Sequence, residues 1–173
     1  MISERDKSLI IKMQSDFLFF LEMCDIKLTD RQIEMVELIK SYDGVVNLIS
    51  DPISGLSFLM CCHFMYRVCF EQNKTFVFVS PKMIMNENNK ATLKMVYSNI
   101  PLFIRPKIVV DNSQSMMFEN GIRILFMSNQ SRSFRGLTCD SLWIDNSWHM
   151  TYSDELIMFI KHYVNKVYTT NTR

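Results

Sequence analysis

Apolar runs of strand length alternate with segments of helical spacing along most of the chain. The runs 45–49 and 75–79 are almost continuously apolar, and segments 55–70 and 83–98 have helical character. Strands that are apolar on both faces need helices on both sides. The pattern therefore predicts an α/β fold with a three-layer, mostly parallel sheet covered by helices on both faces. Further strands are expected at 108–110, 115–118, 122–127, 141–145 and 164–169, and further helices at 6–24, 29–42 and 153–163.

Charge and cysteine content narrow the class of protein. The 173 residues carry 19 Lys and Arg against 18 Asp and Glu, so the net charge is +1 and a strongly basic, polyanion-coating protein is excluded. The five cysteines include no CxxC pair and follow no secretory leader, which favours a reducing, intracellular location. Methionine, phenylalanine and isoleucine are abundant and Ala91 is the only alanine, a bias common in viruses and phages. We expect the host cytoplasm, with association with the virion as the alternative.

Two other classes of site are not expected. Cys61, Cys62 and His63 are adjacent, and neighbouring helical residues point in different directions, so a zinc site is disfavoured. The longest uncharged stretch, 52–66, is too short to span a membrane.

The loop after the first predicted strand has the outline of a phosphate-binding loop. It runs from Ser50 through Ser54 directly into a helix, as in the pattern G-x-x-x-x-G-K-[ST]. Gly55 takes the second glycine position and Ser57 the position of the Mg²⁺ ligand, whereas Ser50 replaces the first glycine. Leu56 stands where the lysine would neutralise the phosphates. Leucine supplies neither a charge nor a hydrogen-bond donor.

The strand at 141–145 ends in a second candidate motif. Asp145 takes the position of the Walker B aspartate, which holds Mg²⁺, and Asn146 takes the position of the catalytic glutamate. An amide orients water but does not accept its proton, and a general base contributes about 10²–10⁴ in rate. Carboxyl ends of parallel strands meet at one edge of a sheet, so the two motifs are expected to lie together.

The order of these motifs resembles the ATPase domain of large terminase subunits, the viral DNA-packaging motors. The resemblance runs from about residue 28 to 172. Segment 75–82 is similar to the family's second strand and its motif, and the Asn120-Gly121 hairpin is similar to its paired strands.

The resemblance assigns further site residues. Gln32 matches the glutamine that contacts adenine. Arg135 lies in a stretch that resembles the segment just before Walker B. Thr169 and Thr170 lie in a stretch similar to the coupling motif, which links hydrolysis to DNA movement. From the residues alone, Gln32 also reads as the partner of Thr29 in a helix capping box.

Three charged functions of the family are missing. Pro52 falls near the position of an earlier basic residue, Leu56 replaces the lysine and Asn146 replaces the glutamate. The resemblance therefore implies an N-terminal helix at 1–27 and a degenerate terminase-like ATPase domain at 28–173. We expect a pseudo-ATPase with no catalytic residue and no cofactor, with weak ATP/Mg²⁺ binding through Ser57 and Asp145 as the alternative.

Three functions remain open at this stage. The leading one is an inactive viral or phage protein that binds and regulates another protein or complex, either packaging machinery or a host factor. The second is a nucleotide-responsive or weakly active ATPase module. The third is a DNA-binding packaging accessory that uses a loose basic set, which comprises Lys82, Lys90, Lys94, Arg105 and Lys107.

Several residues carry both a structural and a functional interpretation. His63 is expected in the core, whereas His149 and His162 have no evident partner. Asn88-Asn89 is an awkward pair inside a predicted helix. Four aromatic residues near the second motif form either a partner-binding cluster or ordinary core: Phe134, Trp143, Trp148 and Tyr152. The surplus apolar positions of the N-terminal helix, such as Phe19, either seat a partner or pack on the chain's own domain.

Overall fold

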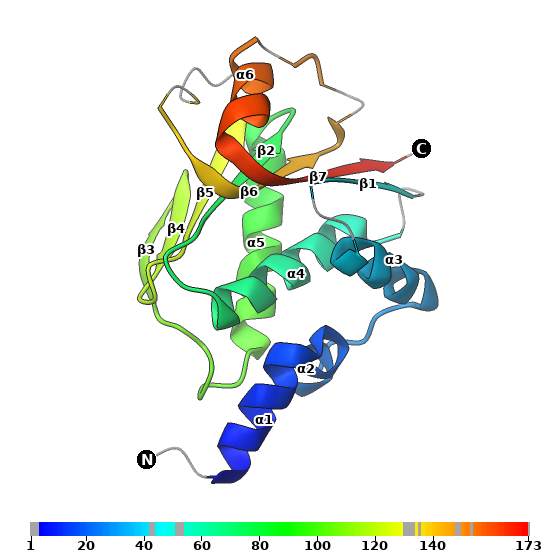
Figure 1. The fold of residues 1–173 in the computed structure, drawn as a ribbon, viewed down its shortest axis with the longest axis vertical. Helices are drawn as coiled ribbons and strands as arrows, with labels where there is room; N and C mark the ends of the chain where they lie inside the picture. Colours follow the sequence, from blue (N-terminus) through cyan, green and yellow to red (C-terminus); the bar gives the residue numbers. More distant parts are fainter. Residues whose placement is uncertain are drawn as a thin grey trace.

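The chain folds into a seven-stranded sheet with helices on both faces (Figure 1). The computed structural model describes residues 4–41, 44–50, 54–129, 134, 136–147, 150–152 and 154–172. The strands are β1 (Val45–Ser50), β2 (Thr75–Ser80), β3 (Ile108–Asn112), β4 (Ser115–Phe118), β5 (Arg123–Ser128), β6 (Cys139–Asp145) and β7 (Val164–Thr172). The helices are α1 (Glu4–Ser15), α2 (Phe17–Met23), α3 (Asp30–Ser41), α4 (Leu56–Phe70), α5 (Met83–Asn99) and α6 (Asp154–Tyr163).

The strand order is β1-β7-β6-β2-β5-β4-β3. Strands β1, β7, β6, β2 and β5 are mutually parallel, whereas β4 is antiparallel to both of its neighbours, β5 and the edge strand β3. The predicted mostly parallel α/β sheet is therefore confirmed. The predicted hairpin is confirmed too, since Asn120-Gly121 joins antiparallel β4 and β5 and Gly121 has φ +82°.

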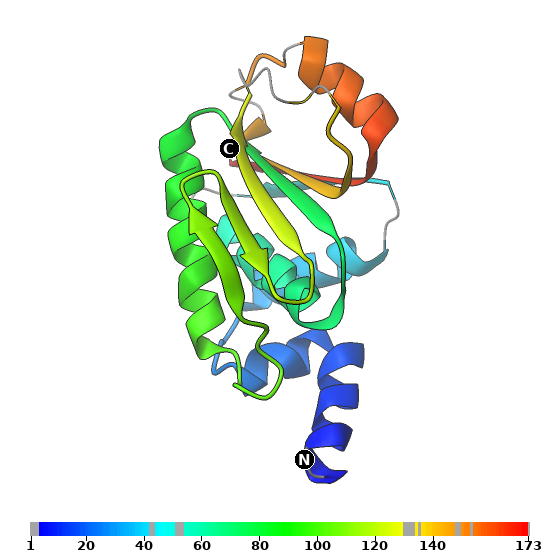
Figure 2. The same ribbon diagram turned by 90° about the vertical axis from the view of Figure 1, so that its left-hand side faces the viewer.

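Two apolar cores lie on opposite faces of the sheet. Figure 2 shows the helices that cover these two faces. The larger core packs α2, α3, α4 and α5 against one face, and Phe64 of α4 stacks on the Trp143 ring of β6. The smaller core packs α6 on the other face, where Leu156 and Phe159 meet Leu142 and Ile144. Alternate residues of a strand face opposite sides, so β6 supplies both cores.

The N-terminal segment differs from the single helix predicted at 6–24. Asp16 has extended backbone, with φ −131°, and separates α1 from α2. Its carboxylate accepts hydrogen bonds from the backbone N–H groups of Leu18 and Phe19 at 3.0 and 3.1 Å. A short polar side chain favours this capping position over a helix interior, which explains the break. The segment contributes to the larger core through Met13, Phe17, Phe20, Leu21 and Cys24, so this part packs on its own domain.

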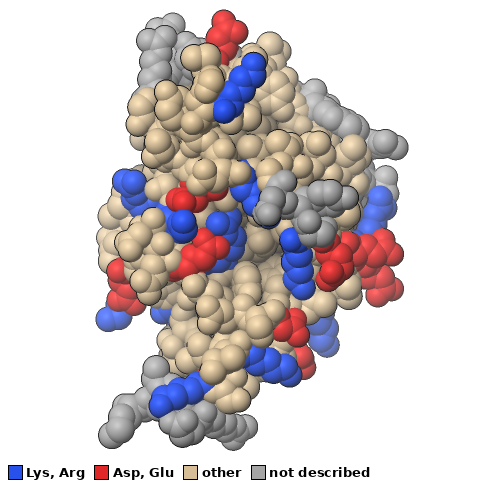
Figure 3. Space-filling model, viewed as in Figure 1, with Lys and Arg blue, Asp and Glu red and all other residues tan. Residues whose placement is uncertain are grey.

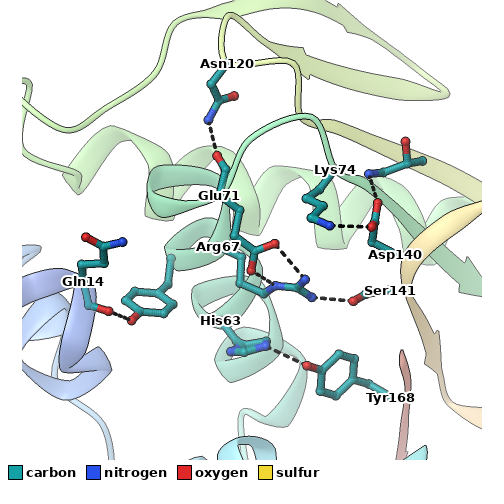
Figure 4. Close-up of polar contacts among 11 residues, drawn as sticks. Gln14, His63, Arg67, Glu71, Lys74, Asn120, Asp140, Ser141 and Tyr168 are labelled. Carbon is teal, nitrogen blue, oxygen red and sulfur yellow. Dashed lines mark hydrogen bonds and ion pairs between the residues drawn. The ribbon is translucent and has the colours of Figure 1, made fainter. Parts of the chain in front are cut away.

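Charged groups tie the end of α4 to the start of β6 (Figure 4). Arg67 donates to Glu71 at 2.6 Å and to the Ser141 hydroxyl at 2.5 Å. Lys74 pairs with Asp140 at 2.9 Å, and Asp140 also accepts from the Thr75 N–H. These contacts lie at the amino ends of the parallel strands, away from the predicted motifs.

Within the described ranges, no helix combines the length and apolar character that crossing a membrane requires.

The core packing generates a stability prediction. Leu59→Ala removes a fully buried side chain of α4 and should cost about 2–5 kcal/mol of unfolding free energy. Urea titration followed by circular dichroism measures it. Leu102→Ala is the matched control, because Leu102 is 78% exposed and its loss should change stability by less than about 0.5 kcal/mol. Equal effects of the two substitutions would contradict the assigned core.

Candidate functional site

The start of α4 is built around Gly55. Gly55 has φ +66°, a left-handed conformation that favours glycine, and Leu56 begins the helix. The side-chain amide of Gln32 donates to the Gly55 carbonyl at 3.1 Å. A Cβ atom at Gly55 would lie 2.6 Å from Gln32 Nε2, so a larger residue would displace this glutamine. The end of the predicted phosphate loop therefore contacts α3 through Gly55 and Gln32.

Gln32 also forms the predicted capping box. Its Oε1 accepts from the Thr29 N–H at 3.0 Å, and its own N–H donates to the Thr29 hydroxyl at 3.3 Å. The capping interpretation is therefore confirmed, and the contact with adenine stays a prediction. Because one amide serves both the cap and Gly55, the α3 start and the loop are held together.

Leu56 is part of the larger core. Its side chain is only 3% exposed and packs among apolar residues of that core. Ser54, directly before Gly55, is half-buried. Residues 51–53, including Pro52, lie outside the described residues, as does the side chain of Ser50. Position 56 therefore has an apolar structural role in this fold.

Asp145 lies at the centre of the site. It is 5% exposed, and three neutral donors from three elements reach its carboxylate. Oδ1 accepts from the hydroxyls of Ser57 at 3.2 Å and Thr170 at 2.8 Å, and Oδ2 accepts from the Asn89 amide at 3.1 Å. Hydrogen bonds to a charged group stabilise by about 1.5–3 kcal/mol each. The carboxylate therefore joins α4, α5 and β7 to the end of β6.

The two threonines of the predicted coupling motif lie on opposite faces of β7. Thr170 accepts a hydrogen bond from the Trp143 indole at 3.0 Å and donates to Asp145. Thr169 faces the other side of the sheet and donates to the Asn47 side chain of β1. Successive strand residues alternate in direction, so only one of the two can reach the aspartate.

Asn146 follows Asp145 in a left-handed conformation, with φ +54°. Asparagine tolerates this region better than most residues, and the side chain is half-buried. Next to it, the Ser147 hydroxyl donates to the Asn171 side chain at 2.7 Å. Arg135, assigned to this site by the resemblance, lies outside the described residues together with Trp148 and His149.

Asn89 is the main contributor that the sequence did not assign. It lies on the buried side of α5, and its backbone carbonyl accepts from the Cys61 thiol at 3.6 Å. The available signal was the poor helix propensity of the pair Asn88-Asn89. A buried polar residue in a helix needs a partner, and Asp145 supplies it.

The predicted basic set is dispersed and partly neutralised. Lys90 and Lys94 both pair with Asp111, at 2.6 and 2.5 Å. Their ammonium groups lower the pKa of the Asp111 carboxyl. Arg105 donates to backbone carbonyls of α5 and lies over the Tyr97 ring. On the face that Figure 3 shows, basic and acidic side chains are interspersed. Pairing with Asp111 therefore describes Lys90 and Lys94 better than a strip for nucleic acid.

The predicted aromatic cluster does not form as one group. Trp143 is buried in the larger core, whereas Phe134 and Tyr152 belong to the smaller core on the opposite face. The sheet separates them, because Trp143 points to the face that α4 covers. These described members are core residues.

His63 is a half-buried structural histidine that packs among aromatic rings. Its Nε2 lies 3.1 Å from the Tyr168 hydroxyl (Figure 4). Its ring meets the Phe17 ring edge-on. Burial, with the nearby charges of Arg67 and Lys166, lowers the pKa of His63 to about 3. The imidazole is therefore neutral at ordinary pH, and the core interpretation is confirmed.

The cysteines and acidic groups offer no second reactive site in the described ranges. There, the five cysteines are free, and burial raises the pKa of Cys24, Cys62 and Cys139 to about 12. Thiols held protonated are poor nucleophiles and poor metal ligands. Within the same ranges, no group of three or more His, Cys, Asp and Glu side chains is placed to hold a metal ion.

The fit of this site to Mg²⁺-ATP is incomplete. Ser57 and Asp145 place two oxygen ligands together, as a magnesium site requires. The helix start at Leu56 directs backbone N–H groups toward the loop, which favours an anion. However, position 56 supplies no cation, position 146 supplies no carboxylate, and three protein donors already occupy the aspartate.

No protein-family model matches the chain, and no curated protein matches it significantly. Its fold is similar to that of phage large terminases. The HK97 bacteriophage enzyme aligns with TM-score 0.69 and 11% identity over 85% of this chain and 33% of its own. The ATPase domain from Thermus phage P74-26 aligns with TM-score 0.67 and 10% identity over 89% and 68%. The enzyme from thermophilic bacteriophage D6E aligns with TM-score 0.65 and 11% identity over 84% and 39%. The chain thus spans well under half of the two longer neighbours, and the likeness establishes the fold alone.

The Asp145 contacts generate a prediction about stability. Asp145→Ala leaves buried Asn89 and Thr170 and half-buried Ser57 without their acceptor and should cost about 2–4 kcal/mol, measured by thermal unfolding. Glu87→Ala, on the exposed side of α5, is the control and should change little. An unchanged or raised Tm for Asp145→Ala would contradict the structural role, because charges kept for metal binding are often held at a cost in stability.

Burial of His63 generates a pH prediction. The unfolded chain takes up a proton near pH 6.5, whereas the folded His63 does so only near its pKa of about 3. His63 therefore does not reduce the free energy of unfolding above pH 6.5. Below that pH the free energy of unfolding falls as pH decreases toward 3, by up to about 1.4 kcal/mol per pH unit. His63→Gln keeps a polar partner for Tyr168 and removes the titration. We expect a smaller decrease in unfolding free energy between pH 7 and 5 for this variant, and parallel profiles would contradict the assignment.

Proposed function

We propose that this chain, which has the fold of a large-terminase ATPase domain, is a catalytically inactive member of that fold. In this proposal it acts by binding and regulating another protein or complex of a viral or phage packaging system. The observation that carries the proposal is the state of Asp145, whose carboxylate joins three elements through neutral donors.

Position 56 supports the loss of catalysis. In a working phosphate loop this residue reaches the phosphates with a positive charge. Here Leu56 is buried in the larger core, so its side chain contributes to packing. A leucine in place of the lysine removes the positive charge that would stabilise the phosphates. Its burial instead packs the start of α4 against the larger core.

Position 146 supports the same conclusion. The Asn146 amide cannot accept a proton from an attacking water, and its left-handed backbone places it in a turn. With neither the lysine nor the glutamate, the site lacks both the charge and the base that hydrolysis needs. What the fold retains is the scaffold and its surface.

One observation favours a second candidate, a nucleotide-responsive module. Ser57 and Asp145 remain 3.2 Å apart, so a magnesium ion could replace their hydrogen bond. The third candidate, a DNA-binding accessory, has less support because Lys90 and Lys94 are already paired with Asp111.

The test is thermal unfolding with and without millimolar Mg²⁺-ATP, together with a phosphate-release assay. A ligand present at 100 times its Kd adds about 2.7 kcal/mol. That gain would raise Tm by roughly 5–10 °C for a domain of this size. We expect no shift and no turnover above background, because the site lacks its cation and its base.

The ATPase domain from Thermus phage P74-26 serves as a positive control in the same assays. A shift without turnover would favour the nucleotide-responsive module. Turnover that Asp145→Ala abolishes would overturn the proposed inactivity.

A further inference from the structure

Two buried amides on one side of α5 reach the carboxyl ends of three strands. Asn86 and Asn89 are three residues apart, so they lie on the same side of the helix, and they are 1% and 5% exposed. The Asn86 amide donates to the Met127 carbonyl of β5 at 2.7 Å, and its oxygen accepts from the Ser80 hydroxyl of β2 at 2.8 Å. The Asn89 amide donates to Asp145 of β6 at 3.1 Å. Side-chain amides therefore fix α5 over the ends of β2, β5 and β6.

The neighbours of Asn89 hold its backbone in place. Its carbonyl accepts from the Cys61 thiol of α4 at 3.6 Å. On the following turns of α5, Lys90 and Lys94 both pair with Asp111 of β3, at 2.6 and 2.5 Å. The helix is thus tied to α4 and to the sheet on either side of this residue. The Asn89 side chain therefore stays within reach of the end of β6.

The three donors at Asp145 differ in what they offer a cation. The hydroxyls of Ser57 and Thr170 donate to Oδ1, and hydroxyl oxygens also carry lone pairs that bind cations. The amide nitrogen of Asn89, which donates to Oδ2, has only hydrogens to present and is not a metal ligand. A magnesium ion bound to Oδ2 in this direction, at about 2.1 Å, would lie only about 1 Å from the nitrogen. The amide and a cation therefore exclude each other at this oxygen.

Burial makes the amide hard to displace. A buried carboxylate needs hydrogen-bond donors or a cation around it, and Asn89 supplies a donor without any ion. A cation that replaced this donor would leave the buried amide without its acceptor, and that cost would be subtracted from the cation's binding energy. The Trp143 indole also donates to the Thr170 hydroxyl at 3.0 Å, which uses one lone pair of that oxygen. The described surroundings of Asp145 are therefore arranged for an ion-free carboxylate.

We propose that Asn89 is the residue that excludes divalent cations from Asp145, because its amide takes the position of a metal ion at Oδ2. This inference rests on the proposed inactivity and assigns a third cause to it. Leu56 removes the charge that binds phosphate and Asn146 removes the base, whereas Asn89 removes the metal position. The three losses are separable, so a single substitution at position 89 restores cation binding without restoring hydrolysis.

The probe is Mn²⁺ without nucleotide, titrated into the protein and followed by the electron paramagnetic resonance signal of the free ion. Asn89→Ala uncovers Oδ2 and should bind Mn²⁺ about tenfold more tightly than the wild type. Asn89→Asp adds a second carboxylate and should bind more tightly still, since affinity rises with ligand charge. The matched controls are Asn88→Ala and Asn88→Asp, at an exposed position of α5, and they should stay within about twofold of the wild type. Adding Asp145→Asn to Asn89→Ala should abolish the gain.

Thermal unfolding gives a second measurement on the same variants. Asn89→Asp places two buried carboxylates together, so its Tm should fall in metal-free buffer and rise when Mn²⁺ is added at constant ionic strength. If this variant unfolds without the ion, recovery of its circular dichroism spectrum on adding Mn²⁺ reports the same binding.

Equal Mn²⁺ affinity of the wild type and Asn89→Ala would overturn the proposal. So would binding by the wild type that Asn89→Ala weakens, because the amide oxygen would then be a ligand. ATP turnover by the wild type would refute the proposed inactivity. An unchanged Mn²⁺ affinity of Asn89→Ala without turnover would refute only the role of Asn89, so the two failures are distinguishable.

Discussion

The carboxylate of Asp145 is the interaction on which the arrangement of the site depends. Its two oxygens collect donors from α4, α5 and β7, elements that are far apart in the sequence. A buried charge is costly unless such donors surround it, so each contact depends on the others. In a working nucleotide site the same oxygens would face a cation. Here three donors of the protein bind them, so the carboxylate holds α4, α5 and β7 to the end of β6.

Much of the site was predictable from the sequence because its geometry follows from strand ends. Gly55, Ser57 and Asp145 were placed together on the rule that parallel strands end at one edge, and Ser57 lies 3.2 Å from Asp145. Gln32 was predicted as a cap from local spacing alone. These inferences need only the chain's own order and the geometry of parallel strands.

The parts that escaped prediction depend on tertiary placement. Asn89 reaches Asp145 only because α5 packs with that side toward the sheet, which local propensity does not reveal. Successive residues of a strand point to opposite faces of the sheet, so Thr169 and Thr170 cannot both face the aspartate. The sequence does not say which of them does. Asp16 broke a helix that its apolar spacing predicted as continuous, since a capping carboxylate competes with the helical backbone.

The pairing of β1 with β7 has a consequence for how the protein reaches this structure. Among the described strands the first, β1, lies beside the last, β7, so Asn47 and Thr169 meet across 122 residues. Closing such a loop is slow, because chain entropy is lost before the contact forms. On the ribosome, β1 has no sheet neighbour until β7 emerges, although its helices are already present. Both edges of this uncharged strand stay open throughout that interval, so synthesis is the period of greatest exposure to aggregation and to early capture by a partner.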